Sequence, residues 1–222
     1  MIIVENLEKY VDNDKNKAHI LKDINIKIEP KELVILKGVS GSGKTTLLSI
    51  ISGLDKPTSG KVLVESEAIH KLPDLHLSKF RASKLGIIFQ SFNLIENFSV
   101  KENLLTPLVN QNYTLSQIEQ MAKSAAKTAN IEHKLDTTVK LLSGGEKQRV
   151  AIARSLVNNP NIIICDEPTA NLDRANSLEF IKTITELNKS GKTVVIATHD
   201  PLFNAIEEKR VINLEDGQIV NE

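Results

Sequence analysis

Eight residues near the start of the chain have the types and spacing of a phosphate-binding loop. They read G-V-S-G-S-G-K-T from Gly38 to Thr45 and match the pattern G-x-x-x-x-G-K-[ST]. Glycines let the backbone bend tightly and point N–H groups at an anion, while Lys44 suits phosphate oxygens and the Thr45 hydroxyl suits Mg²⁺. An ordinary glycine-rich turn is the weaker interpretation. The pattern predicts a nucleotide site formed by Gly38, Ser40, Gly41, Ser42, Gly43, Lys44, Thr45 and Thr46.

Two adjacent carboxylates have the chemistry to hydrolyse a bound nucleotide. Asp166 and Glu167 follow the apolar run Ile162 to Cys165, so we expect them at the carboxyl edge of a sheet, where ligands of open α/β folds bind. Neighbouring residues on a strand face opposite ways, which predicts different tasks. Asp166 is a candidate Mg²⁺ ligand beside Thr45, and Glu167 is the candidate that activates the attacking water. The alternative is a pair of solvated acids at a strand end.

A second candidate anion site lies between these two motifs. Leu142 to Glu146 read L-S-G-G-E. Ser143 is a good N-cap, and the glycines at 144 and 145 expose backbone N–H groups at the start of a helix. The candidate phosphate-binding residues here are Ser143, Gly144, Gly145 and Glu146. A capped helix after a flexible turn has the same pattern.

A sheet flanked by helices is needed to hold these motifs in place. Runs that are apolar on both faces are typical of strands buried between helices, and segments with helical spacing lie between the runs in this chain. Thr114 begins a capping box for one such helix. We therefore predict an α/β fold with a mainly parallel sheet. The candidate strands are 33–36, 87–89, 162–165, 194–197 and 211–214.

Two regions depart from this alternation of strands and helices. An alternating segment from Ile20 to Ile28 ends before Pro30 and predicts an antiparallel strand. Residues 91–158 contain no comparable apolar run, so we interpret them as a mostly helical subdomain inserted in the α/β core. The single phosphate loop favours one domain over residues 1–222.

The composition is that of a globular chain and excludes several other classes. Hydrophobic residues make up 41% and charged residues 25%, and 28 basic residues balance 28 acidic ones. A net charge of zero provides no overall field for nucleic acid, so we expect no nucleic-acid partner. No apolar run is long enough to cross a bilayer and no signal-peptide pattern is present, which predicts a cytoplasmic chain. The single cysteine, Cys165, is expected to be an inert buried thiol.

With these motifs in order, the chain resembles the nucleotide-binding subunit of an ATP-binding cassette (ABC) transporter. The segment Leu142 to Leu156, L-S-G-G-E-K-Q-R-V-A-I-A-R-S-L, is similar to the signature of that family and stands between the phosphate loop and the two carboxylates, as expected. The resemblance covers essentially the whole chain. It implies a P-loop NTPase core of the RecA type, with a small antiparallel β subdomain and a helical subdomain. It also implies ATP and Mg²⁺ as ligands and ATP hydrolysis as the activity.

The resemblance assigns four further residues. Gln90 matches the glutamine that senses Mg²⁺ and water and links to the membrane partner, and His199 matches the histidine that contacts the γ-phosphate. Asp173 lies in the loop that communicates between the two sites of a dimer. Tyr10 matches the aromatic residue that stacks on adenine, with simple packing as its alternative role.

Partners are also implied by the family. The signature loop of one subunit closes over the ATP held by the phosphate loop of another, so we expect an ATP-dependent homodimer. A separately encoded membrane permease is the second expected partner and would hold the chain at the inner face of the cell membrane. The segment Leu85 to Leu94 is similar to a branch of lipoprotein-releasing, macrolide-exporting, antimicrobial-peptide-resistance and cell-division ATPases. That branch implies export of peptides, lipoproteins or antimicrobials, or mechanotransmission.

Two other function classes share part of this pattern. A soluble cassette ATPase of DNA repair or translation would keep every motif, but such proteins usually carry two cassettes, long coiled coils or basic extensions. A small-molecule kinase would share the phosphate loop without needing Leu142 to Glu146.

Overall fold

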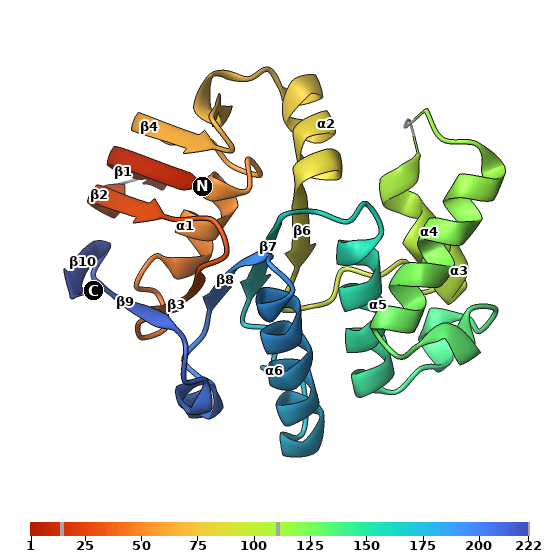
Figure 1. Cartoon of the computed structure of the whole chain (residues 1–222). Helices are drawn as coiled ribbons and strands as arrows, with labels where there is room; N and C mark the ends of the chain where they lie inside the picture. The colour runs from red at the N-terminus through yellow and green to blue at the C-terminus, as the bar shows by residue number, and fades with distance from the viewer. Residues whose placement is uncertain (14–15, 110–111, 222) are drawn as a thin grey trace.

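The computed structural model describes residues 1–13, 16–109 and 112–221, and its central feature is a sheet of six strands (Figure 1). The order across this sheet is β10-β9-β3-β8-β7-β6, and all neighbouring strands are parallel except β10 and β9. The five predicted strands are present, so the predicted α/β class is confirmed. The strands are β3 (Leu33–Lys37), β6 (Leu85–Ile88), β7 (Ile162–Asp166), β8 (Thr193–Ala197), β9 (Arg210–Glu215) and β10 (Gln218–Asn221).

A second, antiparallel sheet is built mainly from the start of the chain. Its order is β2-β1-β4-β5, and the predicted strand before Pro30 is the second half of β2. In Figure 1 this sheet lies beside β9 and β10, with α1 beneath it. The strands are β1 (Ile2–Asn13), β2 (Asn16–Ile28), β4 (Ser59–Val64) and β5 (Glu67–Ala68).

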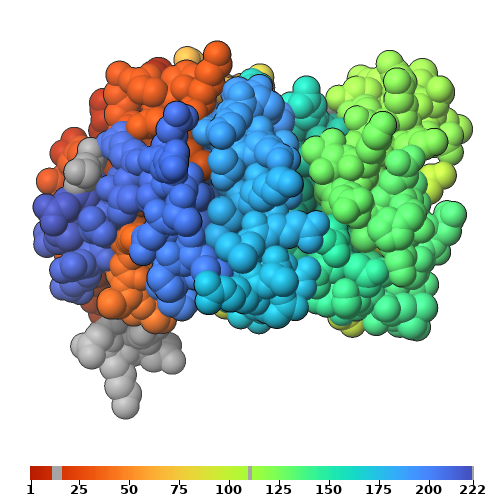
Figure 2. Space-filling view, turned by 60° about the horizontal axis from the view of Figure 1, so that its bottom comes forward, coloured from red at the N-terminus to blue at the C-terminus, as the bar shows by residue number. Residues whose placement is uncertain are grey.

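Helices occupy the region predicted to be a helical insertion. None of the described residues in 91–158 belongs to a strand of either sheet. In Figure 1, α3, α4 and α5 stand together at the end of the molecule opposite the antiparallel sheet, and Figure 2 shows α6 between this end and the C-terminal strands. The helices are α1 (Lys44–Ile51), α2 (Asp74–Lys84), α3 (Val100–Leu105), α4 (Leu115–Thr128), α5 (Gly144–Leu156) and α6 (Arg174–Lys189), with short 3₁₀ turns at Ile69–Lys71, Thr106–Leu108, Glu132–Lys134, Val139–Leu141 and Pro201–Ala205.

Each face of the central sheet packs on its own hydrophobic core. In β3, Leu33 and Ile35 contact the core shared with α3, α4, α5 and α6, whereas Val34 and Leu36 contact the core shared with α1 and the antiparallel sheet. Fully burying one such side chain contributes about 1.5–3 kcal/mol to folding. The continuous apolar runs in the sequence therefore reflect strands that are buried on both faces.

Capping boxes begin three of the helices that surround the sheet. Thr114 accepts a hydrogen bond from the backbone of Gln117, whose side chain bonds back to Thr114, as the sequence predicts. Ser99 and Ser143 begin α3 and α5 in the same way. Such caps satisfy backbone N–H groups that have no partner within the helix. Among the described residues, every helix is too short or too polar to span a lipid bilayer.

Candidate functional site

The predicted phosphate loop connects the buried strand β3 to helix α1. Gly41 and Gly43 have φ values of 82° and 103°, which favour glycine. A β-carbon at Gly43 would also lie 2.8 Å from Leu21 Cδ2 and 3.1 Å from the carbonyl oxygen of Ile20. The loop therefore packs closely against β2, and α1 begins directly after Gly43 with its N-terminus at the loop.

Lys44 is held inside this loop. Its side chain is almost fully buried, and Nζ donates hydrogen bonds to the carbonyl oxygens of Gly38 at 2.8 Å and Val39 at 3.0 Å. Ser42 is also buried, yet its hydroxyl has no hydrogen-bond partner among the described residues. Buried polar atoms are usually paired, so an orphan hydroxyl and a buried ammonium fit a site that receives an anion.

Thr45 and Asp166 form a pair at the start of α1 and the end of β7. The Thr45 hydroxyl donates a hydrogen bond to Asp166 Oδ1 at 3.0 Å. Burial raises the pKa of Asp166 above its ordinary value, the Thr45 hydrogen bond opposes that shift, and the charge of Glu167 adds to it. A nearby cation would stabilise the ionised form. The pair thus presents the hard oxygen donors that Mg²⁺ prefers.

A Mg²⁺ ion fits here only if a substrate supplies further ligands. Within the described residues there is no cluster of three or more His, Cys, Asp or Glu side chains that could hold a metal. Mg²⁺ is commonly bound by one or two protein groups together with waters and substrate phosphates. The arrangement around Thr45 matches that pattern.

Glu167 departs from the direction expected for a strand residue. The strand ends at Asp166, and Glu167 has φ 42°, a left-handed conformation that is rare outside glycine. Its Oε1 lies 3.8 Å from Lys44 Nζ, so both carboxylates reach the first turn of α1. The expectation that they face opposite ways is wrong because β alternation stops one residue earlier.

His199 is the direct partner of Glu167. Its Nδ1 lies 2.9 Å from Glu167 Oε1, and because an ionised carboxylate only accepts, Nδ1 is the donor. The backbone N–H of Glu167 donates to the carbonyl of Ala197 at 2.8 Å, which fixes the turn that carries the carboxylate. Glu167 is largely buried while His199 remains exposed. One oxygen of this carboxylate, Oε1, therefore faces both the Lys44 ammonium and the His199 imidazole.

A cavity of about 380 Å³ brings the phosphate loop, Gln90, Glu167 and His199 together. The segment with Gln90 is tied to the loop after β7, because the Asn171 amide donates to the carbonyl oxygen of Gln90 at 2.9 Å. The cavity thus lies at the carboxyl edge of the sheet, and residues from all of these segments line it. Its lining residues are Ile20, Ser40, Gly41, Gly43, Lys44, Thr45, Thr46, Gln90, Glu167 and His199.

The residues from Ser143 to Glu146 do not line this cavity. Ser143 and Gly144 are exposed at the start of α5. The hydrogen bond from the Ser143 backbone N–H to the Glu146 carboxylate lowers the pKa of that carboxyl. The second predicted anion site is therefore a separate, outward-facing element.

Asp173 and Tyr10 also lie outside the cavity lining. Asp173 is the N-cap of α6 and accepts a hydrogen bond from the backbone of Asn176 at 2.8 Å, which lowers the pKa of the Asp173 carboxyl. Tyr10 lies in β1, with its ring stacked on the imidazole of His19 in β2 at a centroid distance of 4.1 Å. Cys165 is fully buried, and burial raises its thiol pKa, in line with an inert thiol.

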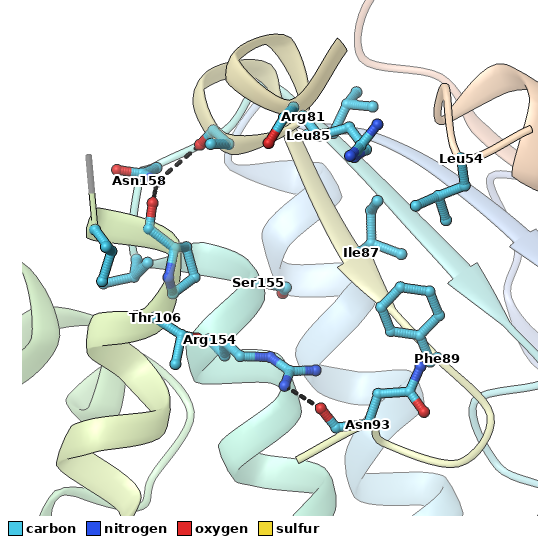
Figure 3. Close-up of a pocket in the computed structure, with 15 residues that line it drawn as sticks. Leu54, Arg81, Leu85, Ile87, Phe89, Asn93, Thr106, Arg154, Ser155 and Asn158 are labelled. Carbon is cyan, nitrogen blue, oxygen red and sulfur yellow. Dashed lines mark hydrogen bonds between the residues drawn. The ribbon is translucent and has the colours of Figure 1, made fainter. Parts of the chain in front are cut away.

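A larger groove of about 620 Å³ lies between α2, β6 and the C-terminal end of α5 (Figure 3). Arg154 reaches across one side of it and donates hydrogen bonds to the carbonyl oxygens of Phe92, at 2.6 Å, and Asn93. Phe92 and Asn93 both have left-handed backbone conformations, with φ 59° and 49°. Helix α5 thereby holds the segment that follows Gln90. The sequence carries no local signal of this contact, because its acceptors are backbone carbonyls about 60 residues away.

Comparison with protein families gives one match that covers most of the chain. Residues 21–170 match the family model described as ABC transporter. The macrolide export ATP-binding/permease protein MacB of Campylobacter jejuni is 39% identical over the whole chain, which spans only 34% of that relative. The ABC transporter ATP-binding protein YxdL of Bacillus subtilis is 40% identical over 91% of the chain and 79% of its own length. The bacitracin export ATP-binding protein BceA of Halalkalibacterium halodurans is 38% identical, and the match covers 99% of this chain and 87% of BceA.

Solved structures agree with these relatives. The dimeric ATP-binding cassette MJ0796, bound to ADP and Pi in a post-hydrolysis state, matches with a TM-score of 0.91 and 38% identity. The match covers 100% of this chain and 97% of the other. The P-loop NTPase core that the resemblance implies is therefore confirmed.

Proposed function

The chain belongs to the ABC transporter family and is a nucleotide-binding ATPase; on that premise we propose that it powers a membrane permease. We further propose that the permease exports peptides, lipoproteins or antimicrobials, or transmits force across the membrane. The relatives named for macrolide export and bacitracin export support the antimicrobial part of that class. The cavity that joins Lys44, Glu167, His199 and Gln90 carries the proposal, because it places a phosphate-binding loop beside a held carboxylate. The relatives give no support to a role in DNA repair or translation.

The phosphate loop is the ATP-binding half of the proposed site. Backbone N–H groups from Gly41 and Gly43 and the start of α1 would surround the β- and γ-phosphates. Lys44 would exchange its bonds to two carbonyl oxygens for bonds to phosphate oxygens. The exchange keeps the buried ammonium paired and gives it a charged partner, which forms stronger hydrogen bonds than a carbonyl does.

Thr45, Asp166 and Gln90 are the proposed holders of Mg²⁺. When bound, Mg²⁺ would neutralise the negative charge that develops on the phosphate oxygens. Thr45 and Asp166 are already within hydrogen-bond distance of each other, so an ion would be received by groups that need little movement. Gln90 lines the same cavity and would add a neutral oxygen donor.

Glu167 is the proposed general base. It would accept a hydrogen bond from the attacking water and orient that water toward the γ-phosphate. It would take the proton of the water as the new P–O bond forms and the P–O bond to the leaving ADP breaks. His199 is proposed to contact the γ-phosphate, and in the present arrangement its Nδ1–H group holds Glu167. Movement of the imidazole toward the phosphate would release the carboxylate for the water.

A second copy of the chain completes the proposed site. Ser143, Gly144, Gly145 and Glu146 lie outside the cavity, so their backbone N–H groups have no phosphate to contact within one copy. The matching cassette is a dimer, which supports an ATP-dependent homodimer here. Asp173, at the start of α6, is proposed to connect the two sites.

The membrane permease is the proposed partner beyond the dimer. The relatives are named as components of export systems, and MacB carries ATP-binding and permease functions under one name. Contact with such a permease would place this chain peripherally at the inner face of the cell membrane.

Capture of the partner tests the proposed function. A Glu167→Gln variant should keep ATP bound, so it would be used with ATP to capture proteins from detergent-solubilised native membranes, followed by mass spectrometry. Recovery of a permease subunit, and its loss with Lys44→Ala, is the expected result. Recovery of ribosomal or DNA-repair proteins instead would overturn the transport function.

A further inference from the structure

Tyr10 does not stand alone as the ring proposed to contact adenine. It is stacked on His19, with the two ring centroids 4.1 Å apart and the planes inclined by only 12°. Tyr10 and His19 are directly paired across β1 and β2. One face of the tyrosine is therefore covered by an imidazole from the same protein.

A bulge in β2 puts this pair beside the phosphate cavity. The pairing shifts from Lys9 with Leu21 to Tyr10 with His19, which leaves Ile20 as one extra residue in β2. Bulges bend a strand and re-aim its side chains, and they are frequent next to active sites. Ile20 lines the cavity of the phosphate loop, and its carbonyl oxygen packs against Gly43. His19, one member of the ring pair, is thus the neighbour in sequence of Ile20, which lines the cavity.

Glu8 holds the imidazole in place. Its Oε2 is hydrogen-bonded to His19 Nε2, while Oε1 accepts a hydrogen bond from the backbone N–H of Asp23 at 3.2 Å. Both Glu8 and His19 are partly buried, with 26% and 31% of their side chains exposed. A carboxylate fixed at both oxygens limits rotation of the imidazole, and the imidazole in turn limits rotation of the tyrosine ring.

We propose that His19 is a positioning residue of the nucleotide site, held by Glu8 and stacked on Tyr10 so that the tyrosine ring is fixed in the plane that receives a purine base. This inference rests on the proposed ATP-binding function. The ammonium of Lys17 also lies over the tyrosine ring, 4.8 Å from its centroid, but it is an exposed side chain on a flexible stem and can move aside for a base. Restricting a ring before binding lowers the entropy lost when the base stacks on it.

Binding of ATP and of inorganic tripolyphosphate to the full chain would test the role of His19. Tripolyphosphate reports on the phosphate loop alone, because it has no base. The change His19→Ala should weaken ATP binding by roughly tenfold, within the range found for the loss of one base-stacking contact. Tripolyphosphate binding should stay within about twofold of the wild type, since the loop is intact. The turnover rate at saturating ATP should be unchanged while KM rises.

Conservative variants separate positioning from a structural role. His19→Phe restores the stack without the hydrogen bond to Glu8 and should recover most of the ATP affinity, whereas Glu8→Gln should show a smaller loss than His19→Ala. His76→Ala, on the exposed side of α2, and Glu5→Gln, on β1, are matched controls. ATP affinity within twofold of the wild type in His19→Ala would overturn the proposal, as would an equal loss of ATP and tripolyphosphate. If wild-type chain and Lys44→Ala bound ATP equally, the proposed function itself would have failed instead.

Discussion

The phosphate loop and the signature segment are both candidate anion sites at helix starts, yet they differ in how far one copy of the chain completes them. Around the loop, Lys44 is buried, Thr45 is bonded to Asp166, and Glu167 is held by His199. At the signature segment, the N-cap Ser143 and the first glycine, Gly144, are exposed, and neither lines the cavity that contains the phosphate loop. The groups of the first region are therefore already paired within one copy of the chain, whereas the second region is an exposed surface.

The difference shows how the two regions divide the work. A buried site with fixed charges can bind a nucleotide and activate water, because its groups need little reorganisation. An exposed helix start can add N–H donors only when another molecule brings phosphates to it. The comparison therefore predicts that changes near the loop affect chemistry most, whereas changes at the signature affect assembly and local stability.

The largest effect is expected for Glu167→Gln. Removing the proposed base should lower kcat by about a hundredfold or more while ATP binding persists. Steady-state ATPase assays and equilibrium ATP binding would measure the two quantities. Glu207→Gln, an exposed change in the same chain, is the matched control. Near-normal turnover in Glu167→Gln would remove this carboxylate from the chemistry.

A change at Asp166 should separate activity from stability. Because burial raises its pKa, the ionised carboxylate is less favourable in the folded chain than in the unfolded one. The stability linked to this group is present below its ordinary pKa of 3.8 and is lost as pH rises through the raised value. Asp166→Asn should therefore raise Tm at pH 7 by about 1–3 °C while lowering Mg²⁺-dependent turnover by about tenfold or more. A lower Tm would show that the charge is well compensated in the fold.

The two signature glycines should respond differently to alanine. A β-carbon at Gly145 would lie 2.2 Å from Asn176 Oδ1, and the Asn176 amide is itself bonded to Asp173 at 2.8 Å. Gly145→Ala should cost about 1–2 kcal/mol of unfolding free energy through that displacement. Gly144→Ala has room, with the nearest atom at 3.6 Å, and should be neutral or slightly stabilising because alanine favours helix. Denaturant unfolding of both variants measures the contrast, and equal losses would contradict it.

The smallest effect is expected for the cap itself. Ser143→Ala removes the side-chain acceptor for the backbone of Glu146 and should cost about 1 kcal/mol at neutral pH. The lowered pKa of Glu146 means that its part of the capping box is present above its ordinary pKa of 4.5 and is lost as pH falls through the folded value. Ser143→Ala keeps the backbone N–H that donates to Glu146, so this part of the box is tested with Glu146→Gln: its difference from the wild type in unfolding free energy should be present at pH 7 and disappear at pH 3. A difference that is constant with pH would show that Glu146 adds nothing.

Features with local causes could be predicted from the sequence. The phosphate loop, the capping box at Thr114, the N-cap at Ser143 and the doubly buried strands each arise from residues close together in the chain. The strand expected at 87–89 lies instead at Leu85–Ile88, because α2 leads directly into it. Boundaries of this kind depend on packing rather than on a periodic pattern.

Features with distant causes could not be predicted. The left-handed turn at Glu167 depends on the end of β7 and on the carbonyl of Ala197. The pairing of Tyr10 with His19 depends on a bulge in a neighbouring strand. Residue types in the sequence therefore identified the candidate residues, but they could not identify the partners that orient those residues.

Mixing two inactive variants tests most directly whether the signature of one copy serves the loop of another. Lys44→Ala disables the phosphate loop and Ser143→Arg blocks the signature, so each homodimer should lack a complete site. In an equal mixture, half of the dimers would join an intact loop to an intact signature once, which predicts roughly a quarter of wild-type ATPase activity. Activity that stays at the level of the separate variants, with both folded and able to associate, would contradict the division between the two regions.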